Sequence, residues 1–145
     1  KEVHYSIKDK NYFALGFKNN SGGFEIRSKY AKICLGSKDV SHIKNGNETI
    51  RIFEGFFDYL SFIQKENLFL KSDYLILNST ALVMKNISIL KNYKQIELYL
   101  DNDATGDKYT SIITETFQNS SDLRFTYNGY KDLNEWFSIC ELEVL

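Results

Sequence analysis

From residue 49 onward, short apolar runs alternate with segments in which apolar residues recur at helical spacing. The apolar runs have the length of single strands, and the segments between them have the three- and four-residue spacing of one helix face. We expect strands over residues 49–53, 74–77, 96–100 and 123–127, and helical segments over residues 56–63, 81–90, 109–117 and 132–139. This alternation predicts right-handed crossovers and an α/β fold, with a mostly parallel sheet of about four strands flanked by helices.

The first 48 residues follow a different pattern, in which short strand-like runs are separated by polar turns. We expect strands over residues 12–17, 23–27 and 31–35, with a turn at the Asn-Asn-Ser-Gly sequence of residues 19–22. Consecutive short strands joined by tight turns favour antiparallel pairing. We therefore predict a small antiparallel β-rich subdomain over residues 1–48, followed by the α/β domain over residues 49–145.

The composition is typical of a folded protein outside the membrane. Of the 145 residues, 43% are hydrophobic and 15% aromatic, which is enough for a packed core. No apolar run approaches the roughly 20 residues that cross a bilayer, and no secretory signal pattern opens the chain. Cys34 and Cys140 are too far apart for a shared metal motif, as expected of free thiols. We expect a cytoplasmic protein without a membrane partner, and the first residue, Lys1, indicates a piece of a longer protein.

Charge is unevenly distributed along the chain. Residues 1–51 hold ten Lys and Arg against five Asp and Glu, whereas the remaining 94 residues hold eight against fourteen. A basic front half attracts polyanions and an acidic back half gathers cations, although an ordinary mixed surface gives the same counts. The cations Arg27, Lys29, Lys32 and Lys38 lie near the aromatic residues Phe24 and Tyr30. This mixture is typical of surfaces for single-stranded nucleic acid, and a solvated strand face explains it nearly as well.

The strand expected over residues 96–100 ends in two carboxylates, Asp101 and Asp103, before a Gly-containing turn into a helix. Side chains two apart on an extended chain point to the same side, so these carboxylates project together. Adjacent carboxylates repel each other and usually need a compensating cation. Mg²⁺ is held by one or two carboxylates together with waters and substrate phosphates. Helix capping explains one Asp but does not require two.

Glu54 follows the strand expected over residues 49–53 in the same way. Because sites in parallel sheets lie beyond the carboxyl ends of the strands, Glu54 and Asp101 are expected at the same edge. Asp58 lies one helical turn after Glu54. It either joins the same metal site or stabilises the positive end of its helix.

A further acidic segment lies near the end of the chain. Asp132 and Glu135 have the three-residue spacing of a helix-capping pair, and capping is the simpler account of both. Lys131, directly before them, is a candidate contact for a phosphate group.

Three segments together resemble the TOPRIM family, and within it the catalytic core of bacterial DnaG-type primases, including the diverged primases of mobile elements. They are Glu54-Gly55-Phe56-Phe57-Asp58, Asn78-Ser79-Thr80-Ala81-Leu82 and Asp101-Asn102-Asp103-Ala104-Thr105-Gly106. Lys131-Asp132-Leu133-Asn134-Glu135 is similar to the short acidic segment near the end of this domain. Residues 11–48 are more loosely similar to the small subdomain that precedes TOPRIM in mobile-element primases.

The resemblance implies roles for the acidic residues. Glu54 would act near the metal or as general acid and base, and Asp101 and Asp103 would be the metal-binding pair. The basic residues that the resemblance implies as contacts of nucleic acid or nucleotide are Arg27, Lys29 and Lys38, whereas Asp58 and Lys131 are candidates from their positions in the sequence alone.

The activity implied by the resemblance is that of a DNA primase. Such an enzyme uses Mg²⁺ or Mn²⁺ to make RNA primers from nucleoside triphosphates on single-stranded DNA, and it would contact a replicative helicase through regions outside this sequence. Two alternatives stay open. One is a TOPRIM-type metal-dependent nuclease, in which water attacks the phosphodiester, and the other is a non-catalytic nucleic-acid-binding module.

Overall fold

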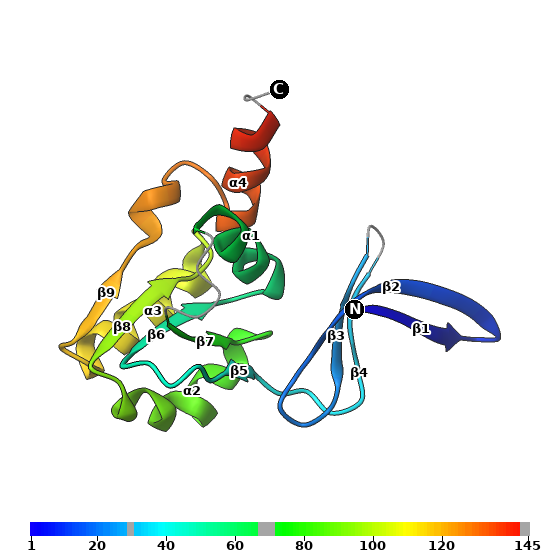
Figure 1. The fold of residues 1–145 in the computed structure, drawn as a ribbon, viewed down its shortest axis with the longest axis horizontal. Helices are drawn as coiled ribbons and strands as arrows, with labels where there is room; N and C mark the ends of the chain where they lie inside the picture. Colours follow the sequence, from blue (N-terminus) through cyan, green and yellow to red (C-terminus); the bar gives the residue numbers. More distant parts are fainter. Residues whose placement is uncertain (29–30, 67–71, 143–145) are drawn as a thin grey trace.

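The computed structural model describes residues 1–28, 31–66 and 72–142, which form an antiparallel sheet beside a mixed sheet covered by helices (Figure 1). The antiparallel sheet has the order β1-β2-β3-β4, with strands β1 Glu2–Ile7, β2 Lys10–Lys18, β3 Phe24–Arg27 and β4 Lys32–Leu35. The three strands predicted in this region are confirmed as β2, β3 and β4. Strand β1 was not predicted. It is joined to β2 by Lys8 and Asp9, whose φ angles of 48° and 61° suit a two-residue hairpin turn.

The second sheet has the strand order β5-β7-β6-β8-β9. Its strands are β5 Ser41–Ile43, β6 Thr49–Phe53, β7 Asp73–Ile76, β8 Gln95–Tyr99 and β9 Ser120–Asp122. Strands β6 to β9 pair in parallel and β5 pairs antiparallel with β7, which confirms the predicted mostly parallel sheet. Strand β5 precedes residue 49 and already belongs to this sheet, while the division into two domains stays a prediction.

The helices α1 Phe56–Glu66, α3 Ala104–Thr116 and α4 Leu133–Leu142 lie where the apolar periodicity predicted them. The helical segment predicted over residues 81–90 is confirmed, although it is not one regular helix: the short helix α2 Val83–Asn86 lies between two 3-10 helices, Thr80–Leu82 and Ile87–Asn92. Asn86 interrupts the helix with a φ of −108° and a ψ of 2°. In the described ranges, no helix has the length and apolar character needed to cross a membrane.

The strand predicted over residues 123–127 was wrong. The sheet takes up residues 120–122 instead, and Arg124–Tyr127 form a 3-10 turn. Asp122 causes the change of direction, because its carboxylate accepts hydrogen bonds from both the backbone N–H and the side chain of Arg124, each at 3.0 Å. Within this turn Tyr127 is buried, whereas Phe125 is 72% exposed.

The core lies on both faces of the second sheet. One cluster includes Ile52 and Leu98 of the central strands with Ile113 of α3, and the other includes Phe53 and Tyr99 with residues of α1 and α4. Central parallel strands buried on both faces read as continuous apolar runs, which is why they were recognisable in the sequence.

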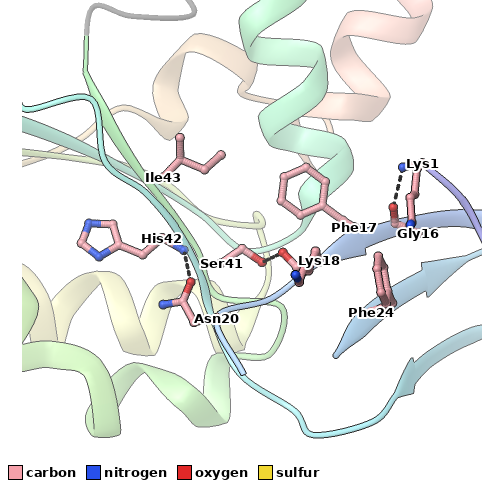
Figure 2. Close-up of a pocket in the computed structure, with 9 residues that line it drawn as sticks. All are labelled: Lys1, Gly16, Phe17, Lys18, Asn20, Phe24, Ser41, His42 and Ile43. Atoms are coloured by element: carbon pink, nitrogen blue, oxygen red, sulfur yellow. Dashed lines mark hydrogen bonds between the residues drawn. The ribbon is translucent and has the colours of Figure 1, made fainter. Parts of the chain in front are cut away.

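The two sheets are joined at strand β5, as Figure 2 shows. The Ser41 hydroxyl donates to the Lys18 carbonyl at 3.0 Å, and the His42 backbone N–H donates to Asn20 Oδ1 at 3.0 Å. The Phe17 ring also stacks on Phe56 at the start of α1, with ring centroids 5.4 Å apart. These contacts hold the N-terminal sheet against the carboxyl end of β6.

Gly106 lets helix α3 begin against the backbone of Asp101, since a Cβ at this position would overlap the Asp101 carbonyl oxygen. We expect Gly106→Ala to reduce the free energy of unfolding by about 1–3 kcal/mol, the usual cost of overpacking. Urea denaturation measures this. Ser111→Ala, at an exposed position of the same helix, is the matched control and should be close to neutral or slightly stabilising. Equal stability of the two variants would contradict the close approach of α3 to Asp101.

Candidate metal centre

A cavity of about 200 Å³ opens at the carboxyl ends of β6 and β8, facing the N-terminal sheet. Four acidic and three basic residues line it: Glu54, Asp58, Asp101, Asp132, Arg27, Lys32 and Lys131. Five of these seven were predicted as site residues. Polar groups converging at this edge of a parallel sheet are typical of binding sites in such folds.

Three of the acids form a cluster that fits a metal ion. Asp58, Asp101 and Asp132 each offer a carboxylate oxygen, and these oxygens lie within 4.8 Å of one another. Hard divalent cations take oxygen ligands at about 2.0–2.6 Å, so oxygens at this spacing are near enough to share one ion. The donor set, three carboxylates with no nitrogen or sulfur, suits Mg²⁺ or Mn²⁺ better than softer metals.

The three acids come from separate parts of the chain, and hydrogen bonds hold these parts side by side. The Asp58 carboxylate accepts from the Asn134 backbone N–H at 3.1 Å, which ties α1 to the start of α4. Asn102, directly after Asp101, donates its backbone N–H to the Lys131 carbonyl at 2.6 Å. Its side-chain amide donates to the Tyr130 carbonyl at 2.8 Å. The segment that carries Asp132 is therefore anchored beside the end of β8.

Burial and mutual repulsion disfavour the ionised form of these acids. Burial, followed by the charges of Glu54, Asp58 and Asp132, raises the pKa of Asp101 to about 7. Burial and the charge of Asp132 raise the pKa of Asp58 to about 6. A cation in the cluster would reverse this balance, because an opposite charge favours the ionised carboxylate.

Glu54 lines the same cavity with one carboxylate oxygen unused. Its carboxylate accepts from the Asp101 backbone N–H, while Oε2 is buried and has no hydrogen-bond partner. Burial, and then the charge of Asp103, raises the pKa of Glu54. A buried carboxylate oxygen without a partner is costly, and a bound ligand or ion would satisfy it.

Asp103 does not line the cavity. It is the N-cap of α3, and its Oδ1 accepts from the backbone N–H groups of Thr105 and Gly106 at 2.9 and 2.8 Å. Asp101 and Asp103 therefore start from the same strand end, but only Asp101 belongs to the cluster. The charge of Asp103 still contributes to the raised pKa of Glu54.

The basic residues surround this cavity unequally. Arg27 and Lys32 reach it from the N-terminal sheet, and Lys131 from the loop before α4. The Arg27 Nη1 atom is buried without a hydrogen-bond partner, and burial lowers the pKa of this guanidinium despite the nearby acids. Lys38 lines a neighbouring cavity of about 130 Å³ that shares Lys32. Lys29 lies outside the described residues.

Two residues of the cavity, Asp132 and Lys32, were not predicted as site residues. Asp132 does have the predicted capping role, because its Oδ1 accepts from the Glu135 backbone N–H at 2.8 Å. The family-like segment 131–135 was the available signal, but a cap explained it without a metal. Lys32 belongs to the cluster of basic and aromatic residues recognised in the sequence, but it was not selected there as a site residue. The hollow of about 420 Å³ in Figure 2, between β2 and β5, contains none of the predicted site residues.

Comparison with protein families agrees with this geometry. The model of the Toprim-like family matches residues 51–137, more than half of the chain. The chain belongs to the Toprim-like family. Residues 1–36 match a domain of unknown function, DUF8464. No curated protein matches the sequence.

Two solved structures from bacteriophage T7 are similar to this chain. The primase fragment of the T7 primase-helicase protein has a TM-score of 0.68 and 18% identity, covering 98% of this chain and 62% of its own. A structure of the T7 lagging-strand DNA polymerase, interacting with primase domains of two gp4 subunits bound to an RNA/DNA hybrid and dTTP, has a TM-score of 0.63. It is also 18% identical, and the match covers 98% of this chain and 76% of that chain. These matches show a shared Toprim fold that includes the N-terminal sheet.

We expect the metal-free protein to lose stability as the pH rises toward 8. The pKa values of Asp58 and Asp101, about 6 and about 7, lie above the ordinary value of 3.8. The folded state therefore binds more protons, and the free energy of unfolding falls as pH rises from about 4 through the folded pKa values. Asp101→Asn removes one of the repelling charges, so its Tm in chelator at pH 8 should exceed that of the wild type by a few degrees. Each kcal/mol added to the free energy of unfolding raises the Tm by about 2–4 °C. The difference should shrink at pH 5.

Magnesium should act in the opposite direction. Added MgCl₂ should raise the Tm of the wild type more at pH 8 than at pH 5, and should raise that of Asp101→Asn less. Glu115→Gln, which removes an exposed carboxylate of α3, is the matched control and should respond like the wild type. A Tm that falls in Asp101→Asn without metal at pH 8 would argue against a strained acid cluster.

Proposed function

We propose that this chain is the catalytic core of a DNA primase, which transfers ribonucleotides to a growing primer on single-stranded DNA. The observation that carries the proposal is the juxtaposition in one cavity of a three-carboxylate cluster, an unpartnered Glu54 oxygen and three cations. Metal-binding carboxylates opposite phosphate-binding cations are what phosphoryl transfer requires. The T7 structure with primase domains bound to an RNA/DNA hybrid and dTTP supports the choice of substrates.

The acid cluster would hold Mg²⁺ or Mn²⁺, with Asp58, Asp101 and Asp132 as ligands. When bound, such an ion supplies charge neutralisation for the triphosphate and for the attacking oxygen. The repulsion among the three carboxylates keeps the site ready for a cation and disfavours a fully ionised empty site. Asn102 and Asn134 position these ligands through the backbone bonds described above.

The chain's own side chains would perform the remaining tasks. Arg27, Lys32 and Lys131 would hold the triphosphate, because they line the same cavity as the acid cluster. Lys131 Nζ lies 3.8 Å from Asp132 Oδ2, so this cation stands beside one of the proposed metal ligands. Glu54, with its raised pKa, would accept or donate a proton near the attacking hydroxyl. Lys29 and Lys38 would extend the contact to the nucleic acid.

We propose that Asp103 contributes beside Glu54 in addition to capping α3. Asp103→Asn keeps a side-chain oxygen for the cap, whereas Asp103→Ala removes it. We expect Asp103→Asn to keep the wild-type Tm within about 2 °C and to lose at least about tenfold in nucleotide incorporation, since each 1.4 kcal/mol is tenfold in rate. Full incorporation by Asp103→Asn would leave Asp103 with a capping role alone.

The chain spans 62% of the length of the T7 primase fragment. The activity to test is therefore extension of a short RNA annealed to a DNA template, with labelled ribonucleotide triphosphates and Mg²⁺ or Mn²⁺. This assay does not require the chain to start a primer by itself.

We expect Asp101→Asn and Glu54→Gln each to reduce incorporation by about 100-fold or more, because the first removes a proposed metal ligand and the second the proposed proton-transfer group. Glu115→Gln should retain full activity. Gel analysis of the labelled RNA measures the effect, and far-UV circular dichroism confirms folding. Unchanged incorporation in both variants would contradict the proposed centre.

The same experiment separates the two alternatives. Cleavage of labelled single-stranded DNA without nucleoside triphosphates, abolished in Asp101→Asn, would identify a nuclease. Salt-sensitive DNA binding that ignores chelator and Glu54→Gln, without incorporation or cleavage, would identify a non-catalytic binding module.

A further inference from the structure

We propose that the N-terminal sheet carries a base-stacking surface for single-stranded nucleic acid, which extends outward from the acid cavity along strand β2. We call this surface the outer strip and define it as His4, Phe13 and Leu15. The identity of the bound strand rests on the proposed function, but the surface itself is argued from the register, exposure and charge of the N-terminal sheet.

Strand register places the outer strip on the same face as the cavity cations. Leu15 lies directly opposite Arg27, and Arg27 lies directly opposite Lys32. Residues opposite each other in antiparallel strands share a face, and so do residues two apart on one strand. Phe13 therefore follows Leu15 on the face of Arg27 and Lys32, both of which line the acid cavity. Its Cα lies about 8 Å from that of Arg27 by ordinary strand geometry.

The side chains of this strip are unusually exposed. Phe13 is 69% exposed and Leu15 41% exposed. Phe13 contacts His4 across the hairpin, with ring centroids 6.1 Å apart, and otherwise presents its ring to solvent. Figure 1 shows the β1–β2 hairpin projecting away from the second sheet and its helices. An exposed apolar patch on a projecting element marks an interaction surface.

Charge favours nucleic acid as the partner. The strip has Arg27 and Lys32 at its inner end, and the exposed Lys8 of the hairpin turn, next to Asp9, at its outer end. Of the acids on this face, Glu2 forms a hydrogen bond with His4 at 2.7 Å and Glu25 is 6% exposed. Rings between cations suit a strand whose bases stack and whose phosphates lie at both ends.

Stacking on Phe13 needs no particular base, so the surface would hold a strand without reading its sequence. A strand held there would continue into the cavity past Arg27, whose Nη1 has no hydrogen-bond partner. This arrangement gives the segment matched to a domain of unknown function a role in holding the strand on which the cavity acts.

The test compares wild type with Phe13→Ala. Fluorescence anisotropy measures the binding of a fluorescein-labelled 20-nucleotide oligodeoxythymidine to each protein. We expect the Kd to rise about 5- to 100-fold, the usual effect of removing one stacking ring. Phe13→Trp should restore wild-type affinity. Tyr12→Ala is the matched control, because Tyr12 is a 42% exposed aromatic residue on the opposite face, stacked on Tyr5.

Wild-type DNA affinity in Phe13→Ala would overturn the proposed role of the outer strip. An equal loss of DNA affinity in Tyr12→Ala would overturn it as well. Light scattering tests whether a second copy of the chain, in place of nucleic acid, covers the outer strip. A wild-type dimer that becomes monomeric in Phe13→Ala, with unchanged DNA binding, would identify a second copy of the chain as the partner and overturn the proposal.

Failure of this inference and failure of the proposed function give different results. If Phe13→Ala binds DNA normally while Asp101→Asn loses incorporation, only the outer strip is wrong. If Phe13→Ala weakens DNA binding but no variant incorporates nucleotides, the outer strip stands and the primase activity fails.

Discussion

The acid cluster depends on the attachment of the loop before α4 to the end of β8. Asn102 makes that attachment with three hydrogen bonds to carbonyl groups of the loop: those of Tyr127, Tyr130 and Lys131. The Tyr127 hydroxyl returns the contact by donating to the Leu100 carbonyl at 2.8 Å inside the core. Without these bonds, Asp132 would belong to a surface helix cap and Asp101 would be one carboxylate at a strand end. The middle residue of the Asp-Asn-Asp segment is thus structural, and it determines which acids meet.

Gathering these acids works against folding. Burial and repulsion raise the pKa values of Glu54, Asp58 and Asp101 together, so the folded chain is less stable when all three are ionised. Proteins retain such arrangements where function needs a charged, partly dehydrated site, and the cost is offset by the surrounding core. Here the two apolar clusters on either face of β6 and β8 fix the strand ends, so the acids cannot separate to relieve their repulsion.

Sequence reasoning succeeded where local patterns determine structure. The apolar runs of β6, β7 and β8 and the periodicity of α1 placed Glu54, Asp58 and Asp101 at one edge of the sheet, as predicted. It failed where a single side-chain bond changes the path of the chain. Asp122 binding Arg124 ends the sheet before residue 123. The apolar residues of 123–127 predict a strand, and their pattern does not include this bond.

The difference between Asp101 and Asp103 has the same origin. Both leave the strand end on one side, as the alternation of an extended chain requires, but α3 begins immediately afterwards and its first backbone N–H groups need an acceptor. Asp103 supplies it, and the close approach allowed by Gly106 keeps α3 against the Asp101 carbonyl. The sequence spacing could predict two carboxylates at one edge, but not that the helix start would use one of them. The unpaired backbone N–H groups at the start of α3 therefore determine which acid remains available to a cation. This is a property of the assembled fold and cannot be predicted from the two carboxylates alone.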